Sequence, residues 1–215
     1  MPITDNKLLQ FLLIDDHEIV RTGINLLLSK IYHPVLIHEA ADGDCATALL
    51  KKNHYDLVLM DIQLPNTDTF GLLEYINIKF PKIKVLMFSM SAERIFAKRF
   101  LKAGAKGFVS KDAPLEEVKI AIGLVLDNKR YISEQLQNQL ADELASDESK
   151  SPFDKLNPKE FEIVTLFLAG DEVAEVSKIL NIKSSTVGLY KNKIFKKLGV
   201  KNFLALQTLY NEHHC

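Results

Sequence analysis

The first 128 residues alternate between short apolar runs and segments with the spacing of amphipathic helices. Uninterrupted apolar runs are typical of strands buried on both faces of a parallel sheet, and their alternation with helices is typical of a doubly wound α/β domain. We therefore predict five parallel strands, at residues 9–14, 35–40, 55–60, 83–88 and 107–111.

The segments that follow the strands have apolar residues at helical spacing, which predicts the buried face of each helix. The fourth and fifth helices are expected to begin at Ser91 and Pro114. The predicted buried positions are Ile19, Ile24, Leu27 and Leu28 in the first helix, and Val118, Ile120, Ile122 and Val125 in the fifth.

The pattern changes after Tyr131, where residues rich in Ser, Asp, Glu and Gln can bury little surface. We predict a linker there, with a helical first half. From Leu156 onward only helical spacing remains, with Asn157 as an N-cap before Pro158 and with Gly199 ending a later helix. The predicted organisation is an α/β domain over residues 1–128, a linker over 129–153, and a small all-α domain of four helices over 154–215.

Charge is distributed unevenly along this chain. The formal net charge of the 215 residues is -1, yet from Lys178 to Lys201 there are seven lysines and no Asp or Glu. That stretch is a candidate for contact with a polyanion. Cys45 and Cys215 make no disulfide framework, and neither a leader nor an apolar run of roughly 18 residues is present. We expect a cytoplasmic protein without a membrane partner.

Polar side chains stand at the ends of four predicted strands. Asp15 and Asp16 follow the first strand, Asp61 the third and Ser89 the fourth, and Lys111 ends the fifth. The carboxyl ends of parallel strands meet at one edge of a sheet, where sites assemble. This edge would hold three carboxylates, a hydroxyl group and an ammonium group. That combination favours an aspartyl phosphorylation site.

Each of these residues has a simpler interpretation when it is read alone. Asp15 or Asp16 could be the N-cap of the following helix, and Ser89 and Lys111 could be solvated loop residues. The interpretation as a site depends on their joint placement at strand ends.

Four sequence blocks together resemble a known family. They are DDHEIVRTGI, DLVLMDIQLPN, AGAKGFVSKDA and KNKIFKKLGV, and they occur in the family's order. The chain resembles a two-component response regulator of the NarL/FixJ family over nearly its whole length. That resemblance implies a flavodoxin-like receiver domain, a linker and a LuxR-type helix-turn-helix domain that binds DNA.

The resemblance also implies a metal ion at the sheet edge. Three clustered carboxylates would repel one another by roughly 4 kcal/mol per close pair at an effective dielectric constant of about 20, which favours a divalent cation. Mg²⁺ prefers oxygen ligands. Asp16 and Asp61 are expected to bind it directly, Asp15 through water, and Gln63 through its backbone carbonyl group.

Phosphorylation chemistry is assigned by the same resemblance. Asp61 is the expected nucleophile, Lys111 pairs with the phosphoryl oxygens, and the Ser89 hydroxyl group donates a hydrogen bond to one of them. Phe108 would turn inward as the switch aromatic, although its sequence context fits a core aromatic equally well.

The third helix of the C-terminal domain is expected to contact DNA with one side. Val187, Ile194 and Leu198 recur at helical period and are predicted to be buried, with Tyr190 beside them. The opposite side would enter the major groove, where Asn192 could read adenine and Leu189 a thymine methyl group. The predicted DNA contacts are Ser184, Ser185, Leu189, Lys191, Asn192, Lys193, Lys196 and Lys197, and the four lysines among them hold phosphates.

This chain departs from the family pattern at several positions. Gly188 stands where a lysine is common, and it weakens the helix by roughly 1 kcal/mol relative to alanine. Lys183 replaces the usual serine, which leaves Ser184 or Ser185 to cap the helix. Thr69 stands where glycine is typical, and it could alter the phosphorylation kinetics.

Three classes of function are considered. The first is a transcription factor that accepts a phosphoryl group from a sensor histidine kinase and binds double-stranded DNA as a homodimer. The alternative is an atypical regulator that binds DNA constitutively, without phosphorylation. The third is an enzyme, either an aspartyl-phosphate phosphatase or a flavin-binding protein, but the acidic loop after the first strand would repel a flavin phosphate. We expect no enzyme activity beyond self-phosphorylation and self-dephosphorylation at Asp61.

His17 and His54 are interpreted as surface or packing histidines.

Overall fold

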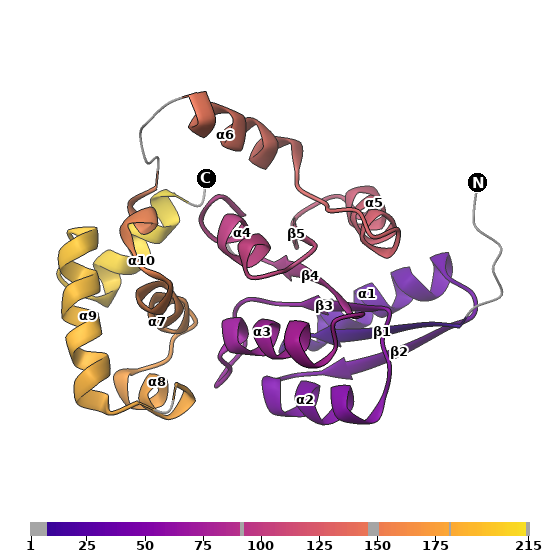
Figure 1. Ribbon diagram of the computed structural model, residues 1–215, viewed down its shortest axis with the longest axis horizontal. Helices are drawn as coiled ribbons and strands as arrows, with labels where there is room; N and C mark the ends of the chain where they lie inside the picture. The colour runs from indigo at the N-terminus through magenta and orange to yellow at the C-terminus, as the bar shows by residue number, and fades with distance from the viewer. Residues whose placement is uncertain (1–7, 91–92, 146–150, 181, 214–215) are drawn as a thin grey trace.

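The computed structural model describes residues 8–90, 93–145, 151–180 and 182–213. The predicted helix start at Ser91 and the cysteine at Cys215 lie outside the described residues. An N-terminal α/β domain and a C-terminal helical domain lie side by side, and the helix α6 (Glu134–Ala145) lies above them in the view of Figure 1.

The N-terminal domain is built on a five-stranded parallel sheet with the order β2-β1-β3-β4-β5. This confirms the predicted fold. The strands are β1 (Leu9–Ile14), β2 (Val35–Ala40), β3 (Leu57–Met60), β4 (Lys84–Ser89) and β5 (Gly107–Ser110). The helices are α1 (Glu18–Ile31), α2 (Gly43–Lys52), α3 (Thr69–Lys79), α4 (Glu93–Lys102) and α5 (Leu115–Leu126).

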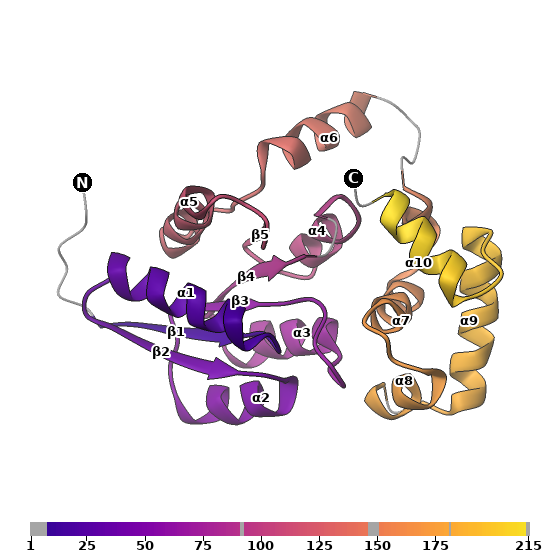
Figure 2. The ribbon, with the colours of Figure 1, turned by 180° about the vertical axis from the view of Figure 1, so that it is seen from behind.

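Alternate residues of the strands face two separate apolar cores, as expected for strands covered on both faces. Phe11 and Leu13 of β1 pack with α1 and α5 on one face, whereas Leu12 and Ile14 pack with α2, α3 and α4 on the other. Figure 2 shows α1 in front of the sheet and α2 and α3 beyond it.

Two residues that were predicted to be buried are exposed. Ile19 is 88% exposed and Ile120 is 57% exposed. Ile24 and Leu28 set the buried side of α1, and a residue five positions before Ile24 points about 140° away from it on a helix. Ile120 lies two positions from Ile122, which is also a large rotation. The prediction of burial from apolar character alone was therefore wrong for these two side chains.

The linker and the C-terminal domain contain six helical elements among the described residues. The predicted helical first half of the linker is confirmed as α6, whereas a short 3₁₀ helix, η1, was not predicted. The elements are α6 (Glu134–Ala145), η1 (Pro152–Lys155), α7 (Pro158–Leu168), α8 (Val173–Ile179), α9 (Ser184–Leu198) and α10 (Phe203–Glu212).

Two of the three predictions about helix ends in the C-terminal domain are confirmed. Asn157 caps α7 as predicted, and Gly199 ends α9 with a φ angle of 71°, in the left-handed region that favours glycine. The prediction that Ser184 or Ser185 caps α9 is wrong. Lys183 is the N-cap, it makes no side-chain capping bond, and both serines lie within the first turn of the helix.

None of the helices in the described part of the chain is long and apolar enough to cross a membrane.

Candidate functional site

The carboxyl ends of β1, β3, β4 and β5 bring the predicted acidic, hydroxyl and lysine side chains together. Asp15 and Asp61 are only 4% and 3% exposed, and Ser89 is also buried. The backbone N–H of Asp61 donates to Ile14 O at 2.9 Å, which holds the ends of β1 and β3 in register. The Ser89 hydroxyl group donates a short hydrogen bond to Asp61 Oδ1.

Lys111 joins the two buried carboxylates. Its Nζ lies 2.6 Å from Asp15 Oδ2 and 2.6 Å from Asp61 Oδ2. Burial alone would lower the pKa of Lys111, but the charges and hydrogen bonds of Asp61 and Asp15 outweigh burial and raise it. The ammonium group therefore remains charged inside the site.

Gln63 lies in the loop directly after Asp61, and Phe108 lies in β5. The backbone N–H of Gln63 donates to Asp61 Oδ1 at 3.2 Å, so this loop folds back over the carboxylate. Phe108 is fully buried in β5. It is the β-sheet partner of Met87 in β4, two residues before Ser89. Its ring packs in the core shared with α4.

His17 takes part in the acidic cluster, which sequence reasoning missed. Its side chain is 63% exposed, as a surface histidine would be, yet Nδ1 lies 2.8 Å from Asp16 Oδ1 and 3.1 Å from Asp15 Oδ1. The available signal was its position at the N-cap of α1, directly after the two acids. His54 is exposed and lies outside this cluster.

Arg21 is a second residue that the sequence analysis did not single out. Its Nη1 donates to the backbone carbonyl oxygen of Asp15 at 2.6 Å, and its Nε donates to Glu39 Oε2 at 3.1 Å. Asn25 also donates to Glu39, at 2.8 Å. The loop that carries Asp15 is therefore fixed by α1 and β2.

The cluster has the ligand set of a hard-metal site. Among the described residues, Asp15, Asp16, His17 and Asp61 offer ligand atoms that all lie within 4.8 Å of one another. Lys111 supplies one positive charge against three carboxylates, so the site retains negative charge that a divalent cation would balance. Carboxylate oxygens are the ligands that such a cation prefers.

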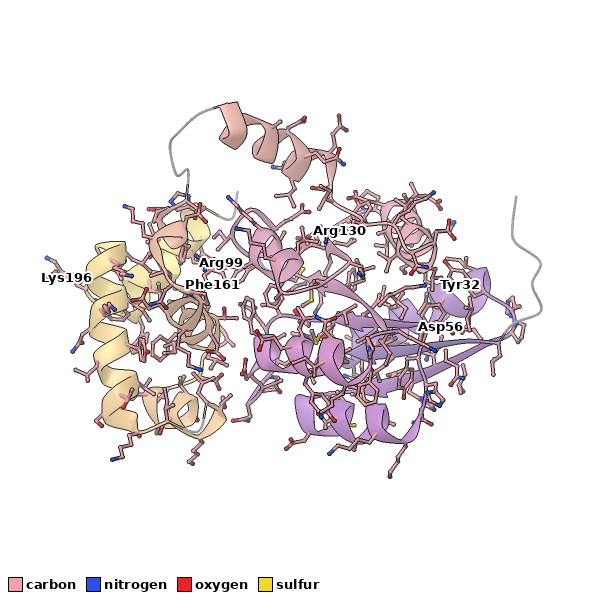
Figure 3. The ribbon with its side chains drawn as sticks, in the orientation of Figure 1. Tyr32, Asp56, Arg99, Arg130, Phe161 and Lys196 are labelled. Atoms are coloured by element: carbon pink, nitrogen blue, oxygen red, sulfur yellow. The ribbon has the colours of Figure 1, made fainter. Side chains whose placement is uncertain are left out.

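In the C-terminal domain, α9 separates its buried and exposed sides as predicted. Val187, Ile194 and Leu198 are buried. Leu189 is 71% exposed. The predicted DNA contacts that are exposed are Ser184, Ser185, Leu189, Asn192, Lys193 and Lys196. Figure 3 shows Lys196 pointing away from the body of the protein.

Three lysines of this predicted set already have partners within the protein. Lys197 Nζ lies 2.6 Å from Glu160 Oε2, and Lys191 Nζ lies 5.5 Å from the centre of the Phe203 ring. Lys193 Nζ is 3.4 Å from Glu160 Oε1, but its side chain is 58% exposed. Lys193 and Lys196 are therefore freer to reach a phosphate than Lys191 and Lys197.

Glu160 joins α7 to α9. Its side chain is fully buried, accepts the backbone N–H of Asn157 at 2.8 Å and forms the ion pair with Lys197. Burial alone would raise the pKa of Glu160, but the hydrogen bonds from Lys197, Asn157 and Lys193 lower it.

Glu160→Ala is expected to destabilise the C-terminal domain by about 1–3 kcal/mol, because the capping bond and the buried acceptor for Lys197 are lost together. Thermal unfolding followed by circular dichroism measures this effect. The control is Glu212→Ala, which removes an exposed carboxylate at the end of α10. Equal melting temperatures for the two variants would contradict the assigned role of Glu160.

Comparisons with known proteins agree with this architecture. Residues 11–123 match the family described as response regulator receiver domain, and residues 154–209 match the bacterial regulatory proteins of the luxR family. The chain is 31% identical over 207 residues to the response regulator UvrY of Escherichia coli K12, covering 96% of this chain and 95% of UvrY. It is 32% identical over 207 residues to the response regulator GacA of Pseudomonas aeruginosa, covering 96% and 97%.

Solved structures with a similar fold include complexes with DNA. One of them is RcsB from Salmonella enterica serovar Typhimurium, bound to promoter rprA in the presence of the phosphomimetic BeF3⁻. Its TM-score is 0.75 at 26% identity, and the match covers 94% of this chain and 98% of RcsB.

Proposed function

Since this chain belongs to the NarL/FixJ family of response regulators, which join a receiver domain to a LuxR-type DNA-binding domain, we propose that phosphorylation of Asp61 controls its binding to DNA. We assign the receiver to residues 1–128, the linker to 129–153 and the DNA-binding domain to 154–215. The phosphoryl donor is a sensor histidine kinase. The observation that carries the proposal is the buried Asp61 carboxylate, contacted by both Ser89 and Lys111.

Asp61 is the nucleophile. One carboxylate oxygen attacks the phosphorus of a phosphohistidine, the P–N bond breaks, and the electron pair of that bond stays with the imidazole of the kinase. The product is an acyl phosphate on Asp61. Lys111 then pairs with the phosphoryl oxygens, since its ammonium group already lies 2.6 Å from Asp61 Oδ2.

The acidic cluster fits Mg²⁺. Asp16 and Asp61 would hold it directly, Asp15 through water, and the carbonyl group of Gln63 would complete the protein ligands. When bound, Mg²⁺ supplies positive charge that balances the carboxylates and the transferred phosphoryl oxygens. Arg21 and Lys111 keep Asp15 in place for that role.

The switch would start at Ser89. Its hydroxyl group now donates to Asp61, and a phosphoryl oxygen would compete for the same donor. A shift of Ser89 changes the space next to β5, where Phe108 is fully buried. The resulting bias between two conformations is typically about 1–3 kcal/mol.

The output is sequence-specific DNA binding by a homodimer. α9 would enter the major groove, with Asn192 and Leu189 contacting bases, and with Ser184, Ser185 and the exposed lysines contacting the backbone. The DNA complex of the similar protein RcsB supports this assignment.

Phosphorylation-independent DNA binding is the alternative function. The direct contacts that join Asp15, Asp61, Ser89 and Lys111 in one cluster disfavour it.

A direct test compares DNA binding with and without phosphorylation. A DNA duplex is selected from a random pool by the full-length protein, and its affinity is then measured before and after incubation with acetyl phosphate and Mg²⁺. Sedimentation of the same samples reports dimerisation. We expect phosphorylation to increase both affinity and dimer content, and unchanged values for both would contradict phosphorylation control.

A further inference from the structure

The DNA-binding domain docks on α4 of the receiver through one arginine. Arg99 Nη2 donates to the backbone carbonyl oxygens of Phe153 and Leu156, at 2.8 and 2.9 Å. The guanidinium carbon also lies 4.0 Å from the centre of the Phe161 ring. Figure 3 shows Arg99 and Phe161 next to each other between the two domains. A planar guanidinium group can make both carbonyl bonds while its flat face stacks on the ring, and a lysine ammonium group has no such flat face.

Aromatic rings surround this contact. Phe161 of α7 lies 5.2 Å from Phe96 and 5.8 Å from Phe70, measured between ring centres. Tyr210 of α10 lies 5.9 Å from Phe96. Phe161 is 1% exposed, so the docked domain removes its ring from water. The contact is therefore a specific apolar interface with a polar anchor.

A second polar contact joins the two domains at the start of α3. Glu162 of α7 lies close enough to Asp68, the N-cap of α3, for the two carboxyl groups to interact, and it pairs with Lys159 at 2.6 Å. Burial, together with the charge and hydrogen bond of Asp68, raises the pKa of Glu162 to about 7, although Lys159 opposes this. The interface thus touches both α3 and α4.

Docking leaves the DNA-reading side of α9 free. In Figures 1 and 2, α9 lies on the side of its domain away from the receiver, and α7 faces the receiver. Leu189, which would contact a base, is 71% exposed in this arrangement. This interface therefore does not mask the recognition helix α9.

α4 is also the first helix after the switch residue. Ser89 ends β4, and α4 begins at Glu93. Glu93 accepts a hydrogen bond from Ser133 Oγ at 2.6 Å, and Ser133 precedes the linker helix α6. A change at Ser89 can therefore be passed on to α4. The first turn of α4 contacts the linker through Glu93, and its C-terminal half contacts the DNA-binding domain through Arg99.

From these contacts we propose that α4 is a docking surface for the DNA-binding domain of the same chain, that Arg99 is its latch, and that docking orients α9 for DNA instead of hiding it. The second half of this statement rests on the proposed DNA-binding function. A domain on a free linker must be oriented again when the second half-site of an operator is bound. A docked domain has already lost that freedom, so docking increases affinity for a two-site operator.

The test uses the full chain and the variant Arg99→Ala. Dyes on Cys45, which is exposed, and on Lys201→Cys in a Cys215→Ser background report the separation of the domains by energy transfer. We expect Arg99→Ala to lower the transfer efficiency, and the control Arg130→Ala, at an exposed position at the start of the linker, to leave it unchanged. Arg99→Lys, which keeps the charge, should give a smaller loss in the same direction and covers the case in which the alanine variant folds poorly.

Measurements of DNA binding distinguish an interface that orients α9 from one that masks it. The probe is the operator selected by the wild-type protein, used whole and cut to one half-site. We expect Arg99→Ala to weaken binding to the whole operator by about tenfold and to leave the half-site affinity unchanged.

Tighter binding of the whole operator by Arg99→Ala would overturn the proposal in favour of masking. Unchanged energy transfer would refute the latch, and separated domains with unchanged operator affinity would refute the orienting role. Failure of the wild-type protein to bind any duplex would instead contradict the proposed function itself.

Discussion

Asp61→Asn is expected to abolish phosphoryl incorporation from acetyl phosphate. The amide oxygen is too weak a nucleophile to attack phosphorus, and the two buried carboxylates that face Lys111 are reduced to one. The side chain keeps its shape and can still accept the Ser89 hydrogen bond. Folding should therefore survive the substitution, and the repulsion between the carboxylates of Asp15 and Asp61 is removed.

Intact mass spectrometry measures the incorporation directly, in the presence of Mg²⁺. The matched control is Asp112→Asn, which removes an exposed carboxylate next to Lys111 in the chain and should retain the full mass gain. A mass gain in Asp61→Asn equal to that of the wild-type protein would show that the phosphoryl group is attached elsewhere.

Asn192→Ala and Lys196→Ala are expected to weaken DNA binding in two different ways. Both side chains are exposed on α9. A bidentate contact between an asparagine and adenine is worth about 1–3 kcal/mol, so the loss of Asn192 should reduce affinity about 5- to 150-fold and relax preference at one base pair. Lys196→Ala should weaken binding to all sequences equally and lower the salt dependence by about one phosphate contact.

Titrations of matched and singly mismatched duplexes at several salt concentrations distinguish these effects. Lys196 is a cleaner probe than Lys191, whose ammonium group lies over the Phe203 ring. If Asn192→Ala weakened all duplexes alike, or if Lys196→Ala changed preference at one base pair, the division into base and phosphate contacts would be wrong.

The receiver half of the fold and its pocket could be predicted because they depend on local sequence and on one rule of topology. A polar residue after an apolar run marks a strand end, and parallel strands bring such ends together. Asp15, Asp61, Ser89 and Lys111 follow from that rule alone. The two exposed isoleucines were mispredicted because apolar character does not specify which side of a helix is buried.

Contacts between distant segments could not be predicted in this way. Lys197 meets Glu160 across 37 residues, and Arg99 meets Phe153 across 54. Sequence spacing predicts that a lysine is on the surface of a helix, but it does not reveal which element packs beside it. His17 is different, since its two acidic partners precede it directly and a local contact with them could have been inferred.

The burial of Glu162 next to Asp68 is expected to make docking a proton-linked equilibrium. A glutamate that is exposed after undocking has a pKa near 4.5, whereas the docked carboxyl group has a pKa of about 7, so docking takes up a proton at intermediate pH. The resulting stabilisation is complete below the lower pKa and is lost as pH rises through the upper one. Between about pH 5 and about pH 8, domain separation should therefore increase with pH, and Glu162→Gln should flatten that dependence. The same chain would then respond to acidity as well as to phosphorylation.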